Sequence, residues 1–337
     1  MPERVADVSF VVPTHNRVDL LAETIRSILH QTLPPREIIV VDNGTEDRAA
    51  AVLAEFGDKV RLLKSAPNQK QVARNTGFAA ATSTWVATLD DDDLLDPAYL
   101  QHVEAAMRDG RADVIGTDHR KFQGSTFERE TNFEQAPPGY WDAVPKPAGG
   151  EVWSFAGKFP LSNLLRRVPI YPSSTVIRRD FALTIGGYDP RMLGIPSEDL
   201  EFLVRALNRG RLAIVWPPLV QYRLHPGNDT ASQVGREVGR WRIFEFVRRE
   251  HRDLPPGFVA ALDANLPARR VEIYEQAFRT NNRALMAEVA PLLRPQDWTP
   301  RQRLRRSVAA LPAPLARALR SVVIAPKRLL GKAPELT

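Results

Sequence analysis

Apolar runs of strand length alternate with segments of helical periodicity over the first 110 residues. The apolar runs occupy residues 8–12, 37–41, 60–63 and 85–89. Helical spacing of apolar residues appears between them, at 18–29, 48–56 and 71–80. Strands that alternate with helices predict an α/β fold with a mainly parallel sheet and right-handed crossovers.

The pattern changes twice further along the chain. A helix at 97–108 and a short strand at 113–116 precede a stretch, 119–165, that is rich in Pro, Gly and aromatic residues and is expected to form loops. Strands at 174–178, 212–215 and 220–223 and a helix at 198–209 follow, and the chain is mostly helical after 232. We therefore expect two halves of one α/β domain, 1–115 and 116–230, and a helical C-terminal region, 231–337.

Polar clusters follow three of the predicted strands, at 13–17, 42–47 and 90–93. Open α/β sheets bind ligands beyond the carboxyl ends of their strands. The three clusters are therefore expected to line one crevice.

Four consecutive aspartates, residues 90–93, form the third cluster. Adjacent carboxylates repel one another unless a cation or hydrogen-bond donors compensate them. Mg²⁺ or Mn²⁺ would do so, since both ions prefer carboxylate oxygens and bridge substrate phosphates. The alternative is a solvated turn, in which Asp is common.

Composition narrows the function classes. The chain has no cysteine, so disulfides and thiolate metal sites are excluded, and a cytoplasmic location is expected. We find no secretion signal and no apolar stretch of transmembrane length. Residues 301–337 carry nine Lys or Arg and one Glu, about +8, so the rest of the chain carries about −2 of the net +6. Because the positive charge lies in the tail and not on a folded patch, a nucleic-acid partner is not expected.

Six motifs in order resemble the inverting family 2 glycosyltransferases, which have the GT-A (Rossmann-like) fold. The motifs are PTHNR, VDNGTED, ARNTG, LDDDD, GGYDP and SED, and the resemblance covers about residues 7–226. The family's usual DDGS(T)D is DNGTED here, with Asn43 in place of the second aspartate. The resemblance implies transfer of a sugar from a nucleoside-diphosphate sugar, UDP or dTDP favoured, to an acceptor hydroxyl.

The resemblance also implies site residues. Nucleotide-sugar contacts are expected at Pro13, Thr14, Asn16, Arg17, Asp42, Asn43, Arg74, Asp90 and Asp91. Metal ligands are expected at Asp92, Asp93 and His225, with Mn²⁺ or Mg²⁺ as the ion. Acceptor contacts are expected at Glu198 and Trp153.

The catalytic base that the resemblance implies is Asp199, the aspartate of the SED motif. Ser197 is expected to cap the following helix, whose N-terminus favours an ionised carboxylate. Each assignment has a structural alternative. Asp199 could only complement the helix dipole, Asp42 could cap a turn, Arg74 could form a surface salt bridge, and a lone histidine such as His225 is more often structural.

Two rival functions remain at this stage: a sugar nucleotidyltransferase and an inactive sugar-binding or scaffolding protein of the same fold. No Gly-rich, basic loop follows the first predicted strand, which disfavours the first rival. The second would be decided by measuring donor turnover.

The tail combines apolar and basic residues. The apolar positions recur at near-helical spacing and are Leu304, Val308, Leu311, Leu315, Leu319, Val322 and Val323. Arginines lie between them, and a basic amphipathic segment of this kind can lie on an anionic membrane. We therefore expect a peripheral contact with the inner face of a membrane and a glycan, lipid-linked or small-molecule acceptor. The alternative is that the apolar stripe packs on the protein, and Pro312, Pro314 and Pro326 would interrupt a long helix.

Overall fold

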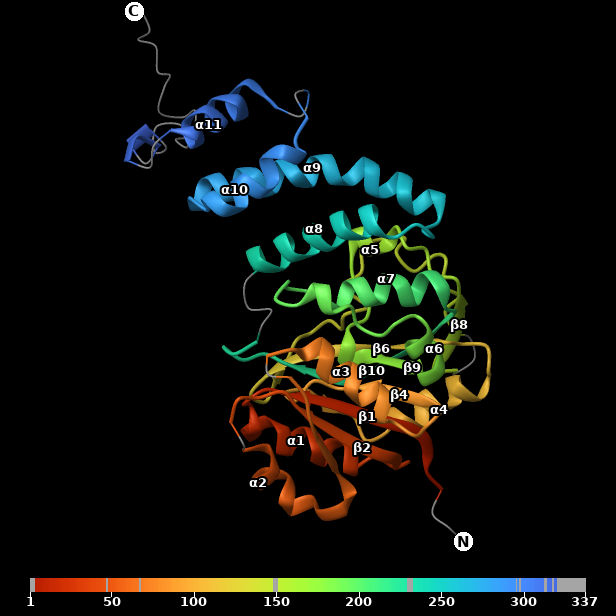
Figure 1. The fold of residues 1–337 in the computed structure, drawn as a ribbon. Helices are drawn as coiled ribbons and strands as arrows, with labels where there is room; N and C mark the ends of the chain where they lie inside the picture. Colours follow the sequence, from red (N-terminus) through yellow and green to blue (C-terminus); the bar gives the residue numbers. More distant parts are fainter. Residues whose placement is uncertain are drawn as a thin grey trace, which may run out of the picture. The chain divides into compact units, whose positions relative to one another are not determined.

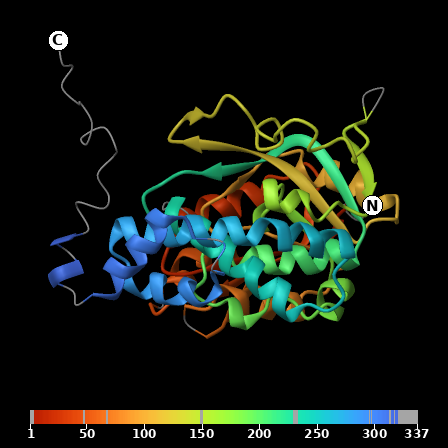
Figure 2. The same ribbon diagram turned by 90° about the horizontal axis from the view of Figure 1, so that it is seen from above.

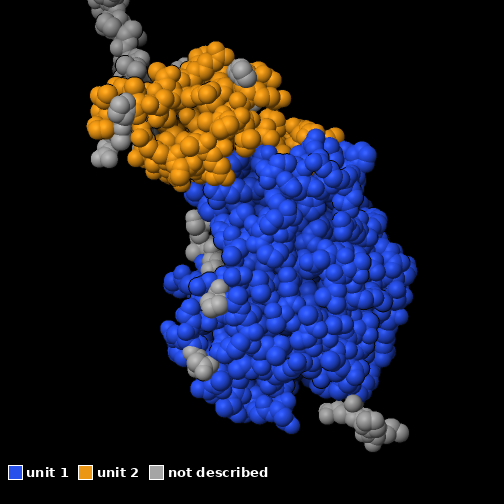
Figure 3. All heavy atoms as spheres, in the orientation of Figure 1, with its two compact units in different colours: residues 1–259 blue, residues 260–337 orange. Residues whose placement is uncertain are grey.

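The computed structural model of the 337-residue chain describes residues 4–46, 48–66, 68–147, 151–228, 233–294, 296, 298–311, 314–316 and 318–319. Two compact units make up the chain, Met1–Val259 and Ala260–Thr337 (Figure 3). The boundary falls later than the predicted 230/231. Helix α8 (Gln233–Glu250) packs on α7 (Asp199–Arg209) and so belongs to the first unit.

One ten-stranded sheet forms the centre of the first unit (Figure 1). Eight strands follow the order β3-β2-β1-β4-β9-β6-β10-β5, and the other two, β7 and β8, pair with β6 and β10. The first four strands along the chain are β1 (Ala6–Thr14), β2 (Pro35–Asp42), β3 (Arg61–Lys64) and β4 (Trp85–Thr88). They pair in parallel, which confirms the prediction for this half.

The other strands make the sheet mixed. Their bounds are β5 (Leu94–Leu95), β6 (Val114–Gln123), β7 (Thr126–Phe127), β8 (Trp153–Gly157), β9 (Thr175–Arg178) and β10 (Leu212–Arg223). Strand β9 runs antiparallel to β4 and β6, and β6 is parallel to β10. Figure 2 shows the β6–β7 hairpin, in yellow, projecting beside β10. The α/β class is thus confirmed, with more antiparallel pairing than the apolar pattern predicted.

Strand β6 continues beyond the predicted end at residue 116. Its next residues, Thr117, Asp118 and His119, are polar but buried. An apolar pattern does not detect a strand that buries polar side chains, so the predicted strand ended at residue 116 and loops were expected from residue 119.

Helices cover both sides of the sheet (Figure 1). Those not yet given are α1 (Val18–Leu29), α2 (Ala49–Leu53), α3 (Lys70–Ala80), α4 (Tyr99–Arg108), α5 (Asn163–Arg166) and α6 (Arg179–Thr184). Short 3₁₀ helices lie at Ala54–Lys59, Pro172–Ser174 and Pro190–Met192. Phe10 and Val12 of β1 belong to a core cluster with apolar residues of α1 and α4. Val11, on the opposite face of β1, meets Gly77 of α3.

The second unit contains most of α9 (Pro256–Thr280), together with α10 (Arg283–Val289), the 3₁₀ helix Ala290–Leu292 and α11 (Pro300–Ala310). A capping box formed by Thr299 and Gln302 begins α11. Arg305 is buried and pairs with Glu275 of α9. None of the helices that the structure describes is long and apolar enough to cross a membrane.

Candidate active site

A cavity of about 250 Å³ lies where the strand ends meet the start of α7. Asp90 and Asp92 line it after β4, and Glu198 and Asp199 line it at the start of α7. Arg74 of α3 also contributes to its wall. The expected crevice therefore exists, and it brings the LDDDD and SED motifs together.

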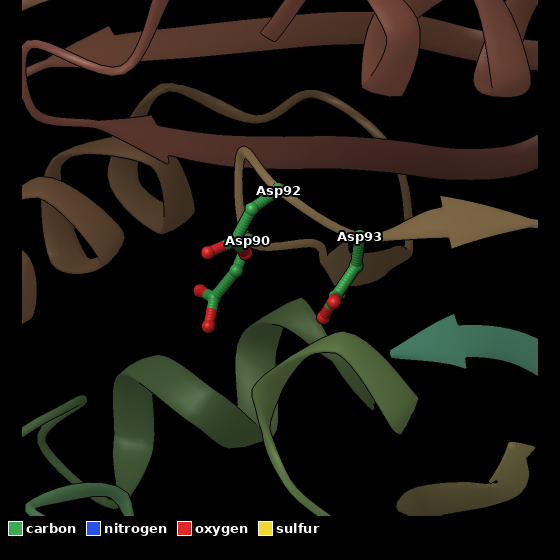
Figure 4. A group of neighbouring side chains, drawn as sticks. All are labelled: Asp90, Asp92 and Asp93. Atoms are coloured by element: carbon green, nitrogen blue, oxygen red, sulfur yellow. The ribbon is translucent and has the colours of Figure 1, made fainter. Parts of the chain in front are cut away.

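The aspartate run presents a carboxylate cluster to this cavity. Oxygen atoms of Asp90, Asp92 and Asp93 lie within 4.8 Å of one another, and Figure 4 shows the three side chains pointing to the same side of the turn. Divalent Mg²⁺ or Mn²⁺ prefers such a set of carboxylate oxygens. The cluster therefore fits the metal that the sequence predicted.

Repulsion within the cluster is visible in its pKa values. Burial, Asp92 and Asp90 raise the pKa of Asp93 well above its usual value. Burial likewise raises the pKa of Asp91 to about 6, although Arg17 opposes this. Arg17 lies 2.5 Å from Asp91 and 2.7 Å from Asp92, so its guanidinium compensates part of the charge of these two carboxyl groups. An additional cation would relieve the remainder.

Asp91 supports the turn and does not face the cavity. It has no exposed surface, and the Thr14 hydroxyl donates to its Oδ2 at 2.6 Å. The predicted sugar contact by Asp91 is therefore wrong for this conformation. Because the Thr14 hydroxyl donates its proton in this hydrogen bond, Thr14 also supports the turn.

The predicted nucleotide contacts at Pro13 and Asn16 also correspond to supporting residues. Pro13 is buried in β1 beside Val41 of β2. Asn16 Oδ1 accepts hydrogen bonds from the backbone of Thr45 (3.1 Å) and Glu46 (3.2 Å). Asn16 thus joins the loops that follow β1 and β2.

A second cavity, of about 380 Å³, shares Lys70, Pro196 and Glu198 with the first. Asn43, an expected nucleotide residue, lines it, and so does His15, which sequence analysis missed. His15 lies inside the PTHNR motif, so its position was the available signal.

Asp42 is 2 % exposed and lies behind the second cavity. Lys64 donates to Asp42 Oδ2 at 2.7 Å, and Gly44 N–H donates to Oδ1 at 2.8 Å. Both carboxylate oxygens already have partners, as the alternative of a turn cap implies, and the predicted nucleotide contact at Asp42 stays a prediction.

Arg74 forms a buried bridge between the two halves of the site. It is 2 % exposed and lies 2.8 Å from Asp90 and 3.4 Å from Glu198. Although burial opposes ionisation of Asp90, Arg74 and Lys70 hold the pKa of that carboxyl below its usual value. The alternative of a surface salt bridge is thus excluded.

Asp199 is the first residue of α7 and is half-buried. Burial and the neighbouring Glu198 carboxylate raise the pKa of Asp199 to about 7, so burial outweighs the favourable helix N-terminus. The predicted cap by Ser197 is wrong: Glu198 occupies the N-cap position, and no side chain caps the helix. Ser197 instead adopts a left-handed backbone with φ 64°.

His225 orients the aspartate cluster in this conformation. Its Nδ1 accepts a hydrogen bond from Gly227 N–H at 3.1 Å. Nε2 lies 3.1 Å from Asp92 Oδ2 and donates to it. His225 thus lies beside the aspartate cluster, and its predicted contact with a metal stays a prediction.

Three aromatic residues of the cavity wall were missed: His119, Tyr171 and Tyr222. The Tyr171 hydroxyl donates to Asp93 Oδ2 at 3.1 Å. Burial, Lys121 and Arg167 lower the pKa of His119 to about 3, so its imidazole is neutral. Only a strand prediction extending through His119 would have placed it at the site.

Trp153, the predicted acceptor contact, lies on β8 opposite Val215 of β10 and packs against the hydrophobic core. It is not among the described residues that line the two cavities. The structure thus gives Trp153 a packing role.

Comparison with known proteins agrees with this geometry. Residues 9–167 match the sequence profile of glycosyl transferase family 2. An uncharacterized glycosyltransferase of Nostoc sp. is 26 % identical over 289 residues, which are 80 % of this chain and 83 % of the relative. The succinoglycan biosynthesis protein ExoO of Rhizobium meliloti is 35 % identical over 130 residues, but the match spans 36 % of this chain and only 37 % of ExoO.

Solved structures share the fold. The crystal structure of Staphylococcus aureus TarS 1-349 in complex with UDP-GlcNAc superposes with a TM-score of 0.57 at 17 % identity, covering 80 % of this chain and 74 % of that one. This likeness shows that the chain has a GT-A fold. Residues 9–167, just under half of the chain, are thus similar to glycosyl transferase family 2.

Proposed function

We propose that the chain transfers a sugar from a nucleoside-diphosphate sugar to an acceptor hydroxyl with inversion at the anomeric carbon. One observation carries the proposal: the aspartate cluster and Asp199 line the same cavity. Arg74 joins the two groups through Asp90 and Glu198. Donor and acceptor could therefore meet in one cavity.

Asp199 is the group that we assign as base. It would take the proton from the acceptor hydroxyl as that oxygen attacks the anomeric carbon and the bond to the nucleoside diphosphate breaks. A base with a pKa of about 7 is half ionised near neutral pH and retains the basicity that proton removal needs. The acceptor oxygen displaces the nucleoside diphosphate in one step, and a single displacement inverts the anomeric carbon.

Asp90, Asp92 and Asp93 would hold Mg²⁺ or Mn²⁺, which when bound neutralises charge on the departing diphosphate. His225 and Arg223 keep this cluster in place. Arg223 N–H donates to Asp93 Oδ1 at 3.0 Å, and its Nε donates to the backbone oxygen of Asp92 at 2.9 Å. Lys70 and Arg17 add positive charge to the cavity wall.

The second cavity is the place that we assign to the nucleoside. His15, Asn43 and Gln71 offer it polar groups, and Gly194 and Ile195 form its other wall. UDP and dTDP remain the favoured nucleotides, because TarS, which shares the fold, has been crystallised with UDP. An acceptor in a polysaccharide or other glycoconjugate pathway agrees with the role of ExoO in succinoglycan biosynthesis.

Release of nucleoside diphosphate tests the proposal. Purified protein would be incubated with UDP-, dTDP- and GDP-sugars, each with Mn²⁺, Mg²⁺ or EDTA. We expect release from one donor group, dependent on the ion. Absence of release from every donor, with or without acceptor glycans, would leave a binding or scaffolding role.

A further inference from the structure

A third cavity, of about 500 Å³, adjoins the first at the ends of β6 and β10. Tyr222 and Asn228 line both cavities, so the two volumes share a wall. The other described residues of the third cavity are Lys121, Gln123, Leu224, His225, Pro226 and Arg236. No described residue of this lining is acidic, although the cavity lies directly beside the aspartate cluster.

Hydrogen-bond donors converge on this cavity from two elements. Lys121 and Gln123 are two residues apart on β6, so they share one face of the strand. Arg236 lies in the first turn of α8, where the helix dipole also favours an anion.

The side chain of Arg236 is available to bind a ligand. Arg236 is half-buried and has no ion-pair or hydrogen-bond partner among the described residues. Lys121 lies 3.8 Å from Glu128, the outer limit of an ion pair. Burying part of an unpaired guanidinium costs free energy, which a bound anion would offset.

We propose that Lys121, Gln123 and Arg236 bind a phosphate group of the acceptor, so that the acceptors of this enzyme are phosphate-bearing. This inference rests on the proposed glycosyl transfer. The donor diphosphate is assigned to the aspartate cluster, on the other side of Tyr222 and His225, and therefore does not need these cations. A phosphate held here would anchor the acceptor while its hydroxyl reaches into the first cavity.

Calorimetric titration with pyrophosphate in EDTA tests the anion site without metal. We expect the parent chain to bind pyrophosphate. Lys121→Gln/Arg236→Gln should bind it at least about tenfold more weakly, because two charge-assisted contacts are lost. The matched control, Lys59→Gln/Arg252→Gln, removes two exposed charges elsewhere in the first unit and should bind like the parent. Equal affinity in both variants, or no binding by the parent, would overturn the proposal.

Titration with UDP and Mn²⁺ separates this site from the donor site. We expect the affinity for UDP to be the same in the parent and in both double variants. If Lys121→Gln/Arg236→Gln lost UDP together with pyrophosphate, the cavity would serve the donor and the proposal would be wrong. If the double variant unfolded, the single variants Lys121→Gln and Arg236→Gln would replace it. Each should bind pyrophosphate several-fold more weakly than the parent.

Competition identifies the source of the phosphate. Farnesyl diphosphate represents a lipid-linked acceptor, and glycerol 3-phosphate represents a soluble phosphodiester unit. Displacement of pyrophosphate by either supports the site and names its source, and displacement by neither contradicts it. Because these titrations need no turnover, their failure is distinguishable from failure of the donor assay.

Discussion

At the scale of single residues, the site depends on which groups offset the negative charge of each carboxylate. Asp90 has Arg74, Asp91 has Thr14 and Arg17, Asp92 has Arg17 and His225, and Asp93 has Tyr171 and Arg223. Only Arg17 is shared, by Asp91 and Asp92, so four chemically identical neighbours have different surroundings. Asp90 and Asp92 line the cavity and Asp93 completes the carboxylate cluster, whereas Asp91 is fully buried.

Asp92→Ala should abolish metal-dependent binding of UDP. The substitution removes a central carboxylate of the cluster. It also frees Arg17 and His225, which then compete with the metal ion for the remaining carboxylates. Calorimetry with UDP and Mn²⁺ measures the effect, and Asp19→Ala, at an acid whose side chain is 91 % exposed, is the control. Parent-like affinity for UDP with Mn²⁺ in Asp92→Ala would refute the assignment.

The pH dependence of turnover should report the raised pKa of Asp199. The base acts only when ionised, so kcat/KM should increase with pH and level off above about 7. Glu198 and Asp90 raise this pKa, and Arg74 lowers it. Glu198→Gln should therefore move the acidic limb to lower pH. A limb near pH 4 in the parent would contradict the assignment.

At the scale of elements, sequence patterns predicted what apolar burial determines. Helix α1 was predicted with its observed bounds, and β1, β2 and β4 to within a few residues, because each buries a regular apolar stripe. The extension of β6 was missed because its buried residues are polar. The roles of Asp91 and Trp153 were missed because motif position does not reveal which side chain of a turn or edge strand faces the cavity.

Close contact between α3 and β1 places Arg74 at the site, and it depends on Gly77. A Cβ atom there would overlap the side chain of Val11. Overpacking costs about 1–3 kcal/mol, whereas Ala gains up to about 1 kcal/mol over Gly in a helix. Gly77→Ala should therefore lower the free energy of unfolding, measured in urea.

Val11→Ala supplies the matched test of this contact. It removes the methyl groups that the new Cβ would meet, so Gly77→Ala/Val11→Ala should lose less stability than the sum of the single changes. Strict additivity, or a Gly77→Ala variant as stable as the parent, would show that α3 has room at this position.

At the scale of the whole molecule, the chain combines a catalytic unit with a helical second unit whose tail is basic. Part of the predicted tail stripe is described: Val308 is buried, whereas Leu304, Leu315 and Leu319 are exposed. Arg305 is buried with Glu275, so it is not available to a membrane. Val322 and Val323 lie outside the described residues. Exposed leucines among arginines still favour the interfacial reading.

We propose that this tail binds anionic membranes. The full chain should co-sediment with phosphatidylglycerol vesicles in low salt and be released by high salt, and a chain that ends at Pro295 should stay in solution. Leu304→Gln/Leu315→Gln/Leu319→Gln should also bind less, with exposed Leu183→Gln as its control. Binding that is equal in all variants, or insensitive to salt, would disprove the role of the tail.

The central claim is that one cavity joins donor binding to a base, and Asp199→Asn tests it most directly. The amide keeps the shape of the side chain but loses its basicity, so turnover should decrease by roughly 10²-fold to 10⁴-fold. Affinity for UDP with Mn²⁺ should stay at the parent value, because the aspartate cluster is intact. Turnover within a few-fold of the parent would contradict the account and assign the base elsewhere.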